Sequence, residues 1–231
     1  TVGVALAALL LGVMIPLVAQ AFDERVWLML NGVGGTYAMS ALNAEIDAIN
    51  AANTGTGWSF ARVTGGNSFG GSVGFEAASQ WNFGVGVDRL EATTEASVAG
   101  SAVEFRLGAN AWRAFGEYAL RPTGQSTLFV GGAIGIIQEN GKIIDAPAGF
   151  TPVVYDTYGA DPMVEGHVGG NWWVTPRFAV TATGGYRYAR VRQIRVEDAP
   201  YITAIGERLS LDFSGPTVRV GIKLAARHPG E

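Results

Sequence analysis

The residues of this sequence with the greatest chemical potential are acids and arginines that recur at every second position inside otherwise apolar segments. Alternate residues of an extended strand point to the same side, so charges at this spacing would share one face of a sheet. Buried charges have to be paired, and the signs of this set nearly balance. We therefore predict an enclosed, paired charge network that plugs the interior. Its members are Glu76, Asp88, Glu104, Arg106, Arg113, Glu117, Glu165, His167, Arg187, Asp212 and Arg219, with Lys223 as a further candidate.

Catalytic and metal-binding chemistry finds little support in the same sequence. His167 has no recognisable Ser-His-acid spacing around it, and the other histidine, His228, stands close to the end of the chain. Asp145, Asp156 and Asp161 lack the ligand spacing of a calcium loop. The chain has no cysteine, which excludes thiolate chemistry, and its net charge of −4 does not favour nucleic-acid binding. We expect no enzymatic activity, no cofactor and no metal.

The segments that carry these charges have the two-residue alternation of β-strands. Only 16% of the residues are charged, and the mean hydropathy of +0.21 is too low for a bundle of membrane helices. Changes of parity at Ala111-Trp112-Arg113 and at Ser214-Gly215-Pro216 predict β-bulges, beyond which Arg113, Glu117 and Asp212 face inward. The eight expected strands lie at Arg25–Met39, Phe69–Ala77, Asn82–Asp88, Val103–Asn110, Thr127–Ile137, Met163–Trp173, Phe178–Tyr188 and Leu209–Leu224.

Short and long connections alternate strictly along the chain. The short ones lie around Gln80-Trp81-Asn82, Pro122-Thr123-Gly124-Gln125 and Val174-Thr175-Pro176. The long ones cover Ser40–Asn67, Glu91–Ala102, Gln138–Pro162 and Gln193–Arg208. Membrane barrels have short periplasmic turns and long outer loops, so the order predicts an all-β fold, an eight-stranded antiparallel up-and-down transmembrane β-barrel.

Two of the long connections have features of their own. Residues 40–52 in the first have a helical composition, with Leu42, Ile46 and Ile49 on one stripe and Ser40 as the candidate cap. We expect this short helix to lie over the barrel rim. The third connection is unusually apolar; it extends its hairpin above the membrane, touches a partner, or packs on its neighbours.

Aromatic residues near the strand ends indicate which face is turned to lipid. Those near the short turns are Trp27, Trp81, Phe83, Phe129, Trp172, Trp173 and Phe178, and those near the long loops are Phe69, Phe105, Tyr186 and Tyr188. Two such groups would form the interfacial girdles of a membrane barrel. A soluble β-sandwich or lipocalin-like barrel is the alternative, because periodicity does not say which face points outward.

The first residues indicate export. Val2–Val18 is almost wholly apolar, and Ala19-Gln20-Ala21 follows it as a small-x-small cleavage site. We predict a helical signal peptide at 1–21, cut so that the mature chain begins at Phe22, then a barrel at 22–226 and a short tail at 227–231. An uncleaved membrane anchor is the alternative for the first segment.

Over residues 22 to 224 the chain resembles the small, eight-stranded outer-membrane β-barrel proteins of Gram-negative bacteria, a porin-like group. Gly-rich alternating hairpins such as GGSVGFEAASQWNFGVGVDRL and the closing LDFSGPTVRVGIKL carry the resemblance. Within the latter, Arg219-x-Gly221-x-x-Leu224 is similar to the signal that the barrel-assembly machinery reads. The resemblance implies residence in the bacterial outer membrane, with its lipid and lipopolysaccharide and the assembly machinery as partners.

The expected function is that of a non-enzymatic barrel, which contributes to envelope integrity or presents its outer loops to a surface ligand. A narrow channel or lateral transporter for a small solute, hydrophobic solutes included, is the first alternative, and a lipid-modifying enzyme that uses His167 is the second. No nucleic-acid partner is expected.

Overall fold

The computed structural model describes residues 26–78, 80–123, 125–203 and 206–226. The predicted signal peptide, its cleavage site, Arg25, His228 and the tail at 227–231 lie outside the described residues. Among the described residues, no helix is both long and apolar enough to span a bilayer.

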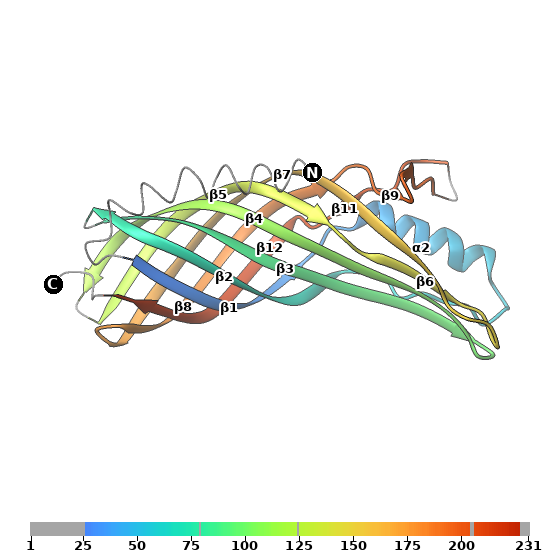
Figure 1. The fold of residues 1–231 in the computed structure, drawn as a ribbon, viewed down its shortest axis with the longest axis horizontal. Coiled ribbons are helices and arrows are strands. Elements are labelled where there is room, and N and C mark those ends of the chain that lie inside the picture. The colour runs from blue at the N-terminus through green and yellow to red at the C-terminus, as the bar shows by residue number, and fades with distance from the viewer. Residues whose placement is uncertain (1–25, 79, 124, 204–205, 227–231) are drawn as a thin grey trace.

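Eight long antiparallel strands close into a ring (Figure 1), which confirms the predicted fold. In ring order they are β1 (Val26–Thr36), β2 (Gly65–Ala78), β3 (Trp81–Val98), β4 (Ser101–Thr123), β5 (Ser126–Glu139), β7 (Val153–Thr175), β8 (Phe178–Val191) and β12 (Gly215–Ala225). The last strand returns to the first, with Leu28 opposite Leu224 and Val33 opposite Arg219. Closure leaves the ring without a sheet edge, as a membrane-spanning sheet requires.

Side-chain parity is unbroken where the sequence predicts bulges. Ala109, Ala111 and Arg113 all point inward along β4, and Phe213 and Thr217 do so on either side of the second predicted bulge. Both predicted bulges are therefore wrong. The interior lining changes from apolar to charged along the axis while the strand keeps its orientation. The observed irregularities of register lie instead at Glu76/Ala78, Ala119/Arg121 and Trp173/Thr175, beside the short turns.

Several strands continue well beyond the lengths predicted from the sequence. The predicted loop Glu91–Ala102 is a β-hairpin, in which β3 and β4 remain paired up to Val98 and Ser101. Ala99 and Gly100 form its turn with φ of 50° and 84°, the positive values of a tight hairpin turn. The third connection also extends its hairpin, through β6 (Lys142–Ala146), which pairs with β4 and β7. The short strands β9 (Arg195–Val196), β10 (Ala199–Pro200) and β11 (Leu211–Asp212) complete this outer region.

The predicted helix is present as α2 (Ser40–Ala52), at the same end of the barrel as the long connections (Figure 1). Its apolar stripe is buried, since Leu42 and Ile46 are each 1% exposed. The predicted Ser40 cap is wrong, because Met39 holds the capping position and no side chain caps the helix. Asn43 instead donates to the Val63 carbonyl and accepts from its N–H, both at 2.8 Å, which ties the helix to the following loop.

A band of exposed apolar side chains surrounds the barrel. It includes Leu28, Leu30, Val73, Ile134, Val164, Val168, Val180, Val218, Val220 and Ile222. A contiguous apolar surface of this extent is unfavourable in water, and it surrounds an interior that carries charges at the same level. This arrangement is that of a transmembrane barrel and excludes the soluble sandwich or lipocalin-like alternative.

Candidate functional site: the filled lumen

Five charged side chains from five strands meet inside the barrel, and we call them the central cluster. They are Asp88 of β3, Arg113 of β4, Glu165 of β7, Arg187 of β8 and Arg219 of β12, and each is at most 5% exposed. Arg219 donates through Nη2 to Asp88 Oδ2 at 2.7 Å and through Nη1 to Glu165 Oε1 at 2.6 Å. Arg187 donates to the same two acids, each at 3.3 Å. Arg187 and Arg219 therefore each connect Asp88 to Glu165.

Strand register and small residues position this cluster. Glu165 and Arg187 are direct cross-strand partners, whereas Arg219 reaches across the lumen to Asp88. The inner wall beside Asp88 is glycine. A Cβ on Gly70 would lie 2.3 Å from Asp88 Oδ1, and a Cβ on Gly86 would lie 2.8 Å from the Cβ of Ser72. Glycine therefore leaves room for the Asp88 carboxylate at position 70 and for Ser72 and the Arg113 guanidinium at position 86.

A second group of polar residues lies on the side of the short turns. His167 is 3.3 Å from Glu117 through Nε2 and 3.5 Å from Glu165 through Nδ1, so it connects this group to the central cluster. Lys223 stands 4.0 Å above the centre of the Trp27 ring, a cation–π contact. We call His167, Glu117 and Lys223 the lower group.

Three predicted members of the network are not part of it. Glu104 and Arg106 lie on the outer extension of β4 and pair with each other, with 2.6 Å between Oε1 and Nε. They are excluded from the interior because Phe105 and Leu107 hold the inward positions of that segment. Asp212 is half-buried and accepts a hydrogen bond from the Ser214 N–H at 3.0 Å, which is a local turn contact.

Glu76 differs from these three, because it faces the lumen without an ion pair at salt-bridge distance among the described residues. It is half-buried near the short-turn end, where it acts electrostatically on Lys223.

The residues of the predicted aromatic girdle lie on both faces of the barrel wall. Trp81, Phe83, Phe69, Trp172, Phe178, Tyr186 and Tyr188 are on the outer face. Trp27, Phe129, Trp173 and Phe105 are between 3% and 7% exposed and point into the interior, so their assignment to the girdle is wrong. Consecutive residues of a strand point to opposite faces, so only one of Trp172 and Trp173 can reach lipid. Trp112, at 47% exposure, is also on the outer face, and the sequence analysis does not include it in the girdle.

An apolar layer fills the interior between the central cluster and the outer end, and we call it the outer plug. Leu90, Ile137 and Met163 contribute from the strands, Phe213 from the segment between β11 and β12, and Leu42 and Ile46 from α2; all are at most 1% exposed. Sequence analysis missed this layer, although it had a signal. On the outer side of Asp88 and Arg113, apolar residues occupy the inward positions of the strands, and the sequence analysis assigns this change to a bulge.

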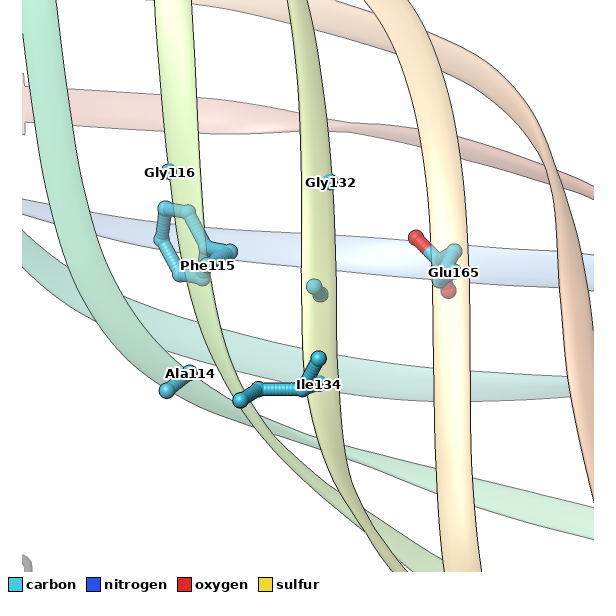
Figure 2. Close-up of a pocket in the computed structure, with 7 residues that line it drawn as sticks. Ala114, Phe115, Gly116, Gly132, Ile134 and Glu165 are labelled. Carbon is cyan, nitrogen blue, oxygen red and sulfur yellow. The ribbon is translucent and has the colours of Figure 1, made fainter.

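Two of the depressions on the surface of the described residues concern the predicted sites. One lies in the barrel wall, where Ala114 and Ile134 stand at the front and Phe115 and Glu165 come from the inward face (Figure 2). The other lies at the outer rim, between Glu139, Asp161 and Arg192. Asp161 binds Arg192, and Asp156 lies 3.8 Å from Lys142, so these acids are engaged separately. Asp145 lies opposite Val103 on β4.

No protein-family model and no curated protein sequence matches the chain. Solved structures that resemble it include Neisserial surface protein A, with 12% identity and a TM-score of 0.46 over 86% of this chain and 96% of that one. Ail of Yersinia pestis in complex with sucrose octasulfate, a heparin analogue, gives 11% identity and a TM-score of 0.48 over 88% and 99%. The outer-membrane protein OprG of Pseudomonas aeruginosa gives 8% and 0.45 over 89% and 98%. The outer-membrane protease OmpT of Escherichia coli gives 9% and 0.33 over 88% and 97%. At these identities and TM-scores nothing about function follows.

Proposed function

We propose that this chain is a closed, non-enzymatic barrel that presents the outer extension of its strands at the cell surface. It has the fold and the lipid-facing belt of a small barrel of the bacterial outer membrane. The observation that carries the proposal is the filling of the interior at three successive levels. The lower group, the central cluster and the outer plug follow one another along the axis. An eight-stranded barrel is just wide enough for side chains to fill it.

The part available to partners is the outer extension of β3, β4, β6 and β7. Its hairpin tips carry no charged residue at 96–103 or 146–152. Phe150 is 76% exposed at the end of the β6–β7 hairpin, and Val153 and Val154 are nearly half exposed beside it. Exposed apolar side chains at loop tips are suited to contact with another surface. The proposal places a surface ligand here, lipid and lipopolysaccharide around the belt, and the barrel-assembly machinery at β12 during insertion.

The proposal includes no catalytic role for His167. Its side chain is enclosed between Glu117 and Glu165 and is 3% exposed, whereas the acyl chains of a membrane lipid contact the opposite face of the wall. A general base has to come within hydrogen-bond distance of the proton that it removes. The enclosed position favours a structural over a chemical role.

Planar-bilayer conductance of the refolded protein tests the closed barrel. The wild type should give no steady current. A triple variant should give measurable current. Arg219→Ala removes a side chain from the central cluster, and Leu42→Ala and Ile46→Ala shorten two side chains of the outer plug. The matched control changes exposed positions only, with Arg106→Ala, Ala44→Ser and Ala51→Ser, and should remain silent. Stable wild-type channels that the first variant leaves unchanged would contradict the proposal.

Lateral passage of a small apolar solute is a second candidate, favoured by the depression in the wall. Its lining combines outward residues, Ala114 and Ile134, with inward ones, Phe115 and Glu165 (Figure 2). Gly132, which also lines it, faces outward between its cross-strand partners Gly116 and Gly166. Gly132→Val should fill the depression and reduce solute uptake into liposomes if this route operates. Uptake equal to that of empty liposomes in the wild type would exclude it.

A further inference from the structure

The central cluster contains more positive than negative charge. Its three arginines face two acids, Asp88 and Glu165, and all five side chains are enclosed. The lower group does not supply the missing charge. Its acid, Glu117, is held by His167 at 3.3 Å and acts on Lys223. Buried charge of one sign is unfavourable without a partner, so the excess needs compensation within the lumen.

The other enclosed acids of the described residues, Glu139 of β5 and Glu45 of α2, lie toward the outer end and are too far along the axis to provide it. Glu139 is fully buried at the outer end of β5, and the arginine that acts on it is Arg89, outside the cluster. Asp88 already accepts from Arg187 and Arg219 through one oxygen, Oδ2. The third arginine, Arg113, approaches the same oxygen only to 3.5 Å. Arg113 is therefore the least well compensated cation of the cluster.

Hydrogen-bonding capacity identifies the same residue. Arg113 Nε and Nη2 and Arg187 Nη1 have no hydrogen-bond partner among the described residues. The side chains of Arg113 and Arg187 are 3% and 0% exposed, so these N–H groups do not reach bulk solvent. Enclosed guanidinium groups normally satisfy their donors. Arg113 also lies within electrostatic range of both Arg187 and Arg219, which repel it.

A hydroxyl group flanks the same position. The point at which a Cβ of Gly86 would stand is 3.4 Å from Arg113 Nη2 and 2.8 Å from the Cβ of Ser72. Ser72 Oγ has no partner among the described residues, and the same holds for both side-chain polar atoms of Asn31 and for Asp88 Oδ1. A Cβ on Gly70 would lie 2.3 Å from Asp88 Oδ1 and 3.1 Å from Asn31 Nδ2, so these two groups stand beside Gly70. Among the unpartnered donors of the described residues, those of Arg113, Arg187 and Ser72 are the ones at or beside the arginines of the central cluster.

We propose that the lumen binds one small monovalent inorganic anion of the size of chloride, held by Arg113 and Arg187 with the Ser72 hydroxyl as a further donor. Water would satisfy the N–H groups and leave the positive charge in place. An anion accepts hydrogen bonds from the N–H groups and also neutralises the excess positive charge. It thereby offsets the repulsion between Arg113 and its two neighbouring arginines. The enclosed position favours a spherical ion over a larger oxyanion. The site does not depend on whether the barrel conducts, so it goes beyond the proposed function.

Equilibrium unfolding of the refolded protein at constant ionic strength tests the proposal, with sodium gluconate replaced stepwise by sodium chloride. The wild-type midpoint should rise with chloride and then saturate, because an ion that binds only the folded state stabilises it by mass action. Arg113→Gln should raise the half-saturating chloride concentration by about tenfold or more. Arg106→Gln, which removes an exposed arginine outside the lumen, should leave it unchanged. Equal wild-type midpoints in chloride and gluconate would overturn the proposal.

Two further measurements keep the test decisive if Arg113→Gln does not fold. Ser72→Ala removes a neutral donor and should weaken the chloride response without abolishing folding. Bromide soaked into crystals of the wild type should give an anomalous peak between Arg113 and Arg187. A peak at the outer loops alone, together with an unaltered chloride response in Ser72→Ala, would show that the lumen holds water only.

Discussion

Arg219 and Asp88 are 131 positions apart in the chain, and their side chains meet inside the barrel with 2.7 Å between Nη2 and Oδ2. Arg219 lies on the closing strand and Asp88 on the third, so the contact crosses the lumen. Glu165 accepts from the same guanidinium at 2.6 Å. A single arginine therefore connects three strands that are not neighbours in the ring.

Loss of this arginine should destabilise the barrel strongly. Arg219→Ala leaves Asp88 and Glu165 enclosed with fewer partners, and removal of one member of a buried ion pair costs ~3–5 kcal/mol. Arg106→Ala is the matched control, because its pair with Glu104 is exposed and such pairs contribute ~0–1 kcal/mol. The free energy of unfolding, measured by urea titration in lipid vesicles, distinguishes the two. Equal losses in the two variants would mean that the lumen is wet and its charges are hydrated separately.

Much of the barrel follows from alternation alone. Around Asp88 and Glu165, apolar and polar residues alternate without interruption, so one face of each strand is charged and the opposite face is apolar. The order of short and long connections then predicts an even, antiparallel ring. The helix at 40–52 can also be predicted from the sequence, because Leu42 and Ile46 have helical spacing within a polar segment.

The polarity of the lining along the axis does not follow from alternation. Phe105 and Leu107 alternate with Glu104 and Arg106 just as the outward residues of the membrane belt do, yet here the apolar set points inward. The reason is that the outer plug replaces lipid as the apolar environment above the belt. The inward direction of Phe105 and Leu107 can be deduced only by counting alternate residues of β4 from Arg113. Ala111 and Ala109 point inward between them and continue the alternation toward the outer end.

The lipid-facing belt should resist the introduction of charge. Val168 is 59% exposed on the outer face of β7, opposite Gly184, and Val168→Arg should cost ~2–4 kcal/mol if it lies near the bilayer midplane. Thr93→Arg, on the exposed face of the outer extension, should change the stability by less than ~0.5 kcal/mol. Unfolding in liposomes measures both. A loss below ~0.5 kcal/mol for Val168→Arg would place that face in water.

The helix should be held in the barrel mouth by its apolar stripe. Ile46→Ala removes a fully enclosed side chain from the outer plug and should cost ~2–5 kcal/mol within the outer region, because the cavity can collapse only in part. Cleavage of the 53–64 loop by an added protease should accelerate, since α2 would detach more often. Ala44→Ser, on the exposed side of α2, is the control. Unchanged cleavage in Ile46→Ala would show that the loop alone retains the helix.

The stability of the outer region should depend on pH through Glu139. This residue lies beyond the belt, where β5 ends, and burial raises the pKa of its carboxyl above the ordinary value of 4.5. Hydrogen bonds to Oε1 from Thr157 Oγ1 at 2.7 Å and from the Gly141 N–H at 2.8 Å oppose the rise only in part, and Oε2 has no partner among the described residues.

The sign follows from proton binding. Between 4.5 and the raised pKa the folded state binds more protons than the unfolded state, so the free energy of unfolding falls as pH rises through that window and becomes constant above it. Glu139→Gln keeps the shape and removes the titration, so it should flatten this part of the profile. Glu104→Gln, at a partly exposed acid of the outer extension, should retain the wild-type slope. The measurement is urea unfolding between about pH 4 and pH 8, since the carboxyl titrates upward from its ordinary value. A slope that persists in Glu139→Gln would assign the pH dependence to another group.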